Sequence, residues 1–92
     1  MLDKSSLIPA VLARLKKMPI GHALDLRTYK RDRSVLIVKQ ANDAFRVVEN
    51  GFAGEEFAVA AAGLARLLKT LLKREFPRSN KIRLYQLGEY DK

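Results

Sequence analysis

One histidine and one carboxylate lie close enough in the chain to suggest acid and base chemistry. His22 is the only histidine, and Asp25 follows three residues later. On a strand, positions three residues apart point to opposite faces, so the two side chains would diverge. The chain has no cysteine, and neither Ser34 nor Ser79 lies in the setting of an activated serine nucleophile. The sequence therefore predicts no catalytic residues and no enzyme activity.

Metal binding needs several donor side chains that converge on one point. Without cysteine, and with one histidine, only carboxylates remain, and Glu55 and Glu56 are the only adjacent acidic pair. We expect this pair just before or within the first turn of a helix, where the helix dipole favours negative charge. Gly51 and Gly54 lack the lysine and the serine or threonine of a phosphate-binding loop. The sequence therefore predicts no metal site and no cofactor.

Positive charge is the strongest feature of the composition. The 92 residues include 18 lysines and arginines against ten acidic residues, which gives a formal net charge of +8. A positive potential of this kind attracts anionic partners such as nucleic acid. Acidic residues are scarce between residues 66 and 83, where Glu75 is the only one. The sequence favours a small basic nucleic-acid-binding accessory protein without catalytic activity, with RNA or DNA as its partner.

The candidate binding residues come from a predicted helix, the turn after it and the last predicted strand. If their basic side chains share one side of the molecule, they would follow a line of phosphates. Tyr85 would share a strand face with two of them and stack on a base. The predicted set is Arg66, Lys69, Lys73, Arg78, Lys81, Arg83 and Tyr85. Each group alone also fits an ordinary solvated surface, because the outer face of an amphipathic helix is normally charged.

The first predicted helix covers the N-terminal part of the chain. Apolar residues recur at helical spacing between residues 7 and 15, which is typical of one buried helix face. Ser5 or Ser6 provides the N-cap, and Pro9 falls in the first turn, where its missing N–H costs no hydrogen bond. Pro19 forbids continuation, so the helix should end shortly before it.

The second predicted helix carries the clearest periodic signal in the chain. Leucines recur at helical spacing between residues 64 and 72, and Pro77 ends the pattern. The segment before this helix has two interpretations. An Asn-Gly pair at residues 50–51 favours a tight turn, after which residues 52–58 fold back as a strand. In the competing interpretation the helix already begins at Glu55.

Four segments have the residue patterns of strands. Residues 23–29 alternate between apolar and polar, whereas residues 35–38 are apolar on both faces, as expected of a central strand. A turn at residues 41–43 leads to a hairpin partner at residues 45–48. Residues 81–85 alternate again and predict a final strand, whose pairing direction the sequence leaves open.

These elements predict an α+β fold. We expect a small antiparallel sheet of three to five strands with two amphipathic helices, in the order α-β-β-(β)-α-β. No linker or internal repeat divides the chain, so residues 1–92 are expected to form a single domain.

Two further hypotheses follow from the same sequence. A central strand that is apolar on both faces, with few helices to cover it, favours a protein-interaction or homo-oligomerisation module, with a protein partner or a homodimer. An enzyme acting on an anionic substrate would need His22, Asp25 and several arginines to meet in one pocket. No apolar run approaches the about 20 residues of a membrane-spanning helix, and no signal peptide is recognisable. We therefore expect a cytoplasmic protein without a membrane partner.

Overall fold

The described part of the chain folds into two helices and six strands. The computed structural model describes residues 2–27, 33–50, 54–75 and 81–89, and all side chains within them except those of residues 2–5, 74–75, 81 and 89. The elements are β1 (Leu2–Asp3), α1 (Lys4–Lys17), β2 (His22–Arg27), β3 (Ser34–Ala41), β4 (Ala44–Asn50), β5 (Glu56–Ala60), α2 (Ala61–Glu75) and β6 (Lys81–Glu89). The predicted α+β fold and its order of elements are confirmed. The described sheet has one strand more than the expected three to five, and this additional strand is the two-residue β1.

All six strands join one sheet in the order β1-β6-β2-β3-β4-β5, and every neighbouring pair is antiparallel. β6 therefore lies between β1 and β2. It is antiparallel to both, which settles the pairing direction that its sequence leaves open. The register of the two central strands places Leu24 opposite Ile37 and Leu26 opposite Val35. All four of these side chains are buried, so the middle of the sheet forms the floor of the core.

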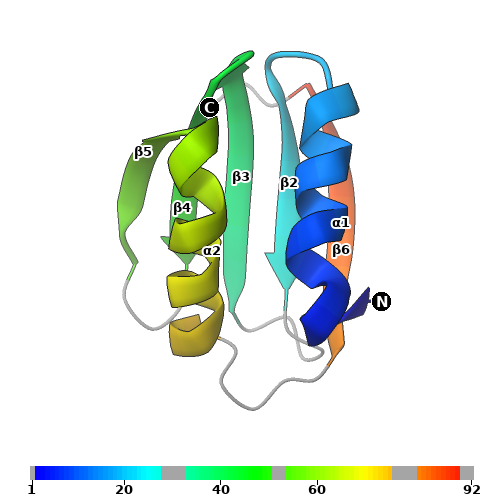
Figure 1. Ribbon diagram of the computed structural model, residues 1–92, viewed down its shortest axis with the longest axis vertical. Coiled ribbons are helices and arrows are strands. Elements are labelled where there is room, and N and C mark those ends of the chain that lie inside the picture. Colours follow the sequence, from blue (N-terminus) through cyan, green and yellow to red (C-terminus); the bar gives the residue numbers. More distant parts are fainter. Residues whose placement is uncertain (1, 28–32, 51–53, 76–80, 90–92) are drawn as a thin grey trace.

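Both helices lie on the same face of the sheet, side by side and antiparallel to each other (Figure 1). Each helix buries its apolar stripe against the sheet, and these stripes are the ones that the helical spacing predicts. The helices contribute Leu7, Val11, Leu15, Leu64, Leu68, Leu71 and Leu72 to the core. The sheet contributes Leu24, Leu26, Val35, Ile37, Phe45, Val47 and Ile82. No helix of the described part covers the opposite side of the sheet, which we call the open face.

The start of α1 differs from the prediction. α1 begins at Lys4, so Ser5 and Ser6 lie inside the helix instead of capping it, and Pro9 lies in the second turn. At that position the missing N–H of proline removes one intrahelical hydrogen bond. The earlier start includes Leu7 in the helix, where its fully buried side chain begins the apolar stripe. The helix ends at Lys17, which confirms the predicted end shortly before Pro19.

The ambiguous segment before α2 is a strand, and it is displaced from the predicted range. β5 covers Glu56–Ala60, and α2 begins directly after it at Ala61. β5 pairs with β4 and brings Phe57 and Val59 against the core, which favours the extended conformation over an earlier helix start. Glu56 therefore lies on a strand, not in the first turn of a helix. Residues 51–53 and the end of the predicted strand, at residues 28–29, lie outside the described residues.

A buried lysine from the sheet holds the C-terminal end of α1. Lys39 is only 5% exposed, and its Nζ donates to the carbonyl oxygens of Leu15 at 2.8 Å, Met18 at 2.9 Å and Lys16 at 3.4 Å. The last carbonyls of a helix lack the usual partner four residues later, and the helix dipole makes this end negative; here Leu15 also accepts a longer bond of 3.4 Å from the N–H of Met18. All three ammonium protons are thus directed at the backbone. Lys39 is therefore a structural cation, and its buried charge is not accessible to a partner.

Candidate nucleic-acid interface

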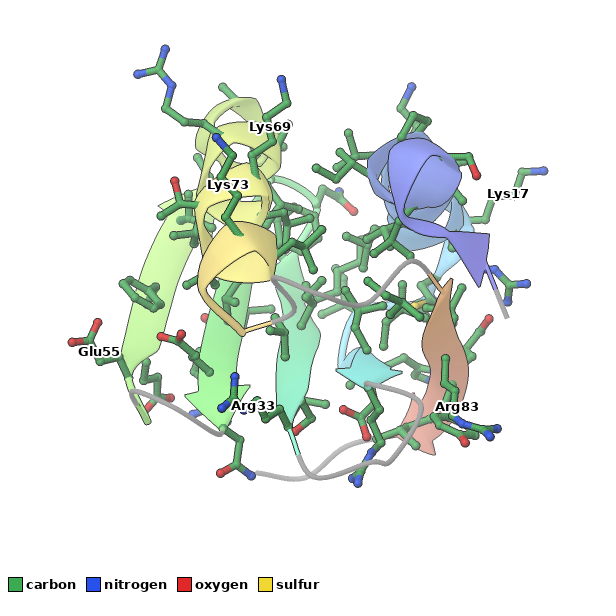
Figure 2. All side chains as sticks on the ribbon, turned by 90° about the horizontal axis from the view of Figure 1, so that it is seen from below. Lys17, Arg33, Glu55, Lys69, Lys73 and Arg83 are labelled. Atoms are coloured by element: carbon green, nitrogen blue, oxygen red, sulfur yellow. The ribbon has the colours of Figure 1, made fainter. Side chains whose placement is uncertain are left out.

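The outer surface of α2 carries three of the predicted binding residues. Arg66, Lys69 and Lys73 are exposed, and their spacing of three and four residues places them on one side of the helix. The buried leucines of α2 occupy the other side. Figure 2 shows Lys69 and Lys73 extending away from the sheet. The structure therefore brings this part of the predicted set together.

The last turns of α1 add three exposed cations that the sequence interpretation missed. They are Arg14, Lys16 and Lys17. Basic residues near a helix C-terminus complement the helix dipole. Because this role already explains them, the sequence offers no reason to include them among the predicted binding residues. α1 contains no acidic residue at all, which the sequence does reveal once the limits of the helix are known. Arg14 also reaches β6, where its Nη1 donates to Oε1 of Gln86 at 3.3 Å.

Nearly all of the excess charge of the protein belongs to these two helices. α1 and α2 together contain eight of the 18 basic residues and one of the ten acidic residues, so they carry seven of the eight net positive charges. We call their exposed basic side chains the cationic helix surface: Arg14, Lys16, Lys17, Arg66, Lys69 and Lys73. Within the described part of the chain none of these side chains forms an ion pair with a carboxylate.

Two hollows lie along the seam between α1 and α2. The larger, of about 410 Å³, is lined by Leu12, Leu15, Lys16, Lys39, Asn42, Phe45, Ala61 and Leu64. The smaller, of about 270 Å³, is lined by Ile8, Lys69, Thr70, Leu72 and Lys73. Three lysines of the cationic helix surface therefore border the seam, with apolar side chains beneath them.

The β6 members of the predicted set lie on the other side of the sheet. Ile82 is buried in the core and Leu84 packs against it, so the alternating positions Arg83 and Tyr85 belong to the open face. Lys81 has the same strand parity, but its side chain is not described. Arg78 lies outside the described residues. The described members of the predicted set are thus divided between two faces, with Arg66, Lys69 and Lys73 on α2 and Arg83 and Tyr85 on the open face.

On the open face, ion pairs hold two arginines. The Nε atom of Arg27 lies 2.6 Å from Oδ2 of Asp25 on the same strand. The Nε atom of Arg46 lies 3.0 Å from Oε2 of Glu56, an electrostatic contact in which the buried N–H makes no hydrogen bond. Arg27 is directly opposite Arg83 on β6. Sequence reasoning missed Arg27 because its neighbour across the sheet depends on a register that no local pattern reveals.

The residues that first suggested catalysis have other contacts. Asp25 is 6% exposed and its carboxylate accepts a hydrogen bond from Arg27, while His22 begins β2 and is half-buried. Among the described residues no three side chains of the histidine, cysteine, aspartate or glutamate type converge as metal ligands would. The described helices include none with the length and apolar character needed to cross a membrane.

Comparison with known proteins found no match: no protein-family model, no curated protein and no solved structure is significantly similar to the chain. The function is therefore inferred from the chemistry of the cationic helix surface and the open face.

Proposed function

We propose that the protein binds nucleic acid through the cationic helix surface, by contacts to phosphates and without catalysis. The observation that carries this proposal is the location of the charge, since α1 and α2 hold seven of the eight net positive charges. An amphipathic helix needs only a polar outer face for solubility, and alternating acidic and basic residues would provide it. Like charges three or four residues apart on a helix repel, so carboxylates among them would stabilise α2. Their absence favours a role in binding.

The extent of the surface fits a polymer better than a small anion. α1 has 14 residues, and at the rise of an α-helix it extends for about 21 Å. Along the axis of a duplex each strand carries one phosphate per about 3.4 Å, so a nucleic acid presents several phosphates over that length. Lysines on mobile side chains contact phosphates without reading the bases. The proposed binding is therefore independent of sequence.

Fluorescence anisotropy with labelled duplex DNA and RNA tests this proposal. Six phosphate contacts predict that the logarithm of affinity falls against the logarithm of salt concentration with a slope of about −5. Affinity should then drop about a thousandfold between about 50 mM and about 200 mM salt. Folded protein that fails to bind at the lower salt concentration would contradict the proposal. Equally tight binding to an acidic polypeptide would favour a protein partner instead.

A further inference from the structure

The open face arranges its side chains in rows that run across the strands. The register places one polar row from β6 to β4, which we call the arginine row: Arg83, Arg27, Ser34 and Asn50. No member of this row is acidic. The next row along the strands, which we call the platform row, contains Tyr85, Asp25, Leu36 and Val48 from β6 to β4, and the register continues it to Glu56 on β5. The two rows are separated by two residues along each strand, or about 6.7 Å.

The platform row presents mainly aromatic and apolar surface to solvent. Tyr85, Leu36 and Val48 are half-buried, so a part of each remains accessible on a face that no described helix covers. Asp25 is 6% exposed, and its carboxylate is directed at Arg27 in the arginine row. An aromatic ring beside such apolar side chains provides a support on which an unpaired base can stack.

The arginine row brings two cations next to each other on the open face. Arg27 and Arg83 face each other directly across β2 and β6, and like charges in that relation destabilise a sheet. The 2.6 Å contact between Asp25 and Nε of Arg27 orients the guanidinium group of Arg27, whose side chain stays 39% exposed. Two neighbouring guanidinium groups are suited to bidentate contacts with a phosphate. At the β5 edge of the open face, Glu56 forms an ion pair with Arg46. Its negative charge disfavours phosphate binding there, so the surface suited to phosphate lies on the β6 side.

We infer that the open face binds single-stranded nucleic acid, with the backbone on the arginine row and a base stacked on Tyr85. The separation of the rows matches this use, because a phosphate on one row leaves its base over the other. A duplex cannot bind in the same way, since its bases are stacked inside the helix. The inference goes beyond the proposed function, because the open face and the cationic helix surface lie on opposite sides of the sheet (Figure 2).

Anisotropy with a labelled oligothymidine and a labelled duplex tests this inference. Both are measured in a Lys69→Glu/Lys73→Glu background, which weakens the cationic helix surface and leaves the open face unchanged. Tyr85→Leu should lower the affinity for the oligothymidine about tenfold, whereas Tyr85→Phe, which retains the ring, should stay within about twofold. Arg83→Gln should reduce the salt slope for the single strand by about 0.7. None of the three changes should alter duplex affinity.

The inference is overturned if Tyr85→Leu and Tyr85→Phe bind the oligothymidine equally well while both remain folded by circular dichroism. It is also overturned if light scattering shows a wild-type dimer that Tyr85→Leu dissociates, because the open face would then bind a second copy of the chain. The two proposals can fail separately. The proposed function fails when charge reversal on α2 leaves duplex affinity unchanged, and the inference fails on single-strand affinity alone.

Discussion

Charge reversal at Lys69 and Lys73 is expected to lower the affinity for duplex DNA about 60-fold at about 0.1 M salt. Each phosphate contact contributes about 0.9 to the salt slope, so removing two contacts should also flatten that slope by about two. The measurement is anisotropy over a series of salt concentrations with the Lys69→Glu/Lys73→Glu variant. Both side chains are exposed and extend away from the sheet, so the fold should tolerate the change.

Two variants with the same change in net charge, one on α2 and one elsewhere, show whether the loss of affinity depends on the position of the charge. Lys69→Gln/Lys73→Gln and Gln40→Glu/Ala41→Glu each lower the net charge by two, and the second pair changes exposed positions at the end of β3. If net charge alone attracts the duplex, the two variants should lose equal affinity. If the cationic helix surface is the site, only the lysine variant should show the loss and the reduced salt slope. Equal losses would contradict the assignment of the site to α2.

Lys39→Met is expected to destabilise the protein by about 2–3 kcal/mol and to lower the melting temperature by about 10–20 °C. Methionine keeps the length of the side chain but has no donor for the three carbonyl oxygens that Lys39 contacts at the end of α1. Relief from burying the ammonium group offsets a part of the lost hydrogen bonds. Thermal and urea unfolding followed by circular dichroism measure the effect.

The matched control for this change is Lys17→Met, which makes the same substitution at an exposed position in the last turn of α1. This variant loses only a favourable interaction with the helix dipole, so it should cost less than about 1 kcal/mol. Similar melting temperatures for the two variants would contradict the structural role assigned to Lys39. Duplex affinity offers a second contrast, because Lys17 belongs to the cationic helix surface and Lys39 does not.

The local elements were predictable because their side chains carry periodic patterns. The leucine stripe of α2 and the alternation of Leu24 and Leu26 report which positions are buried, and both are core residues in the structure. β5 was harder to assign because its five residues are too few to distinguish a strand from a helix start. Its pairing with β4 decides the matter, and that contact involves residues distant in sequence.

The division of the candidate site between two faces could not be predicted from the sequence. β3 is apolar on both sides, with Val35 and Ile37 on one and Leu36 and Val38 on the other, so it does not indicate which face the helices cover. Helical spacing correctly groups Arg66 with Lys69 and Lys73, since that relation is local. Arg83 and Tyr85 are separated from them because they alternate with Ile82 and Leu84, which face the core. That both helices lie on this core side is a long-range property of the fold.

The most direct test of the central claim is a nuclear magnetic resonance titration of the protein with duplex DNA at low salt. We expect the backbone amide signals of α1 and α2 to shift, with the largest changes near Lys16, Lys69 and Lys73, while those of β3 and β4 change little. Shifts confined to the sheet strands, or no shifts at all with folded protein, would contradict the claim that the helices form the nucleic-acid-binding surface.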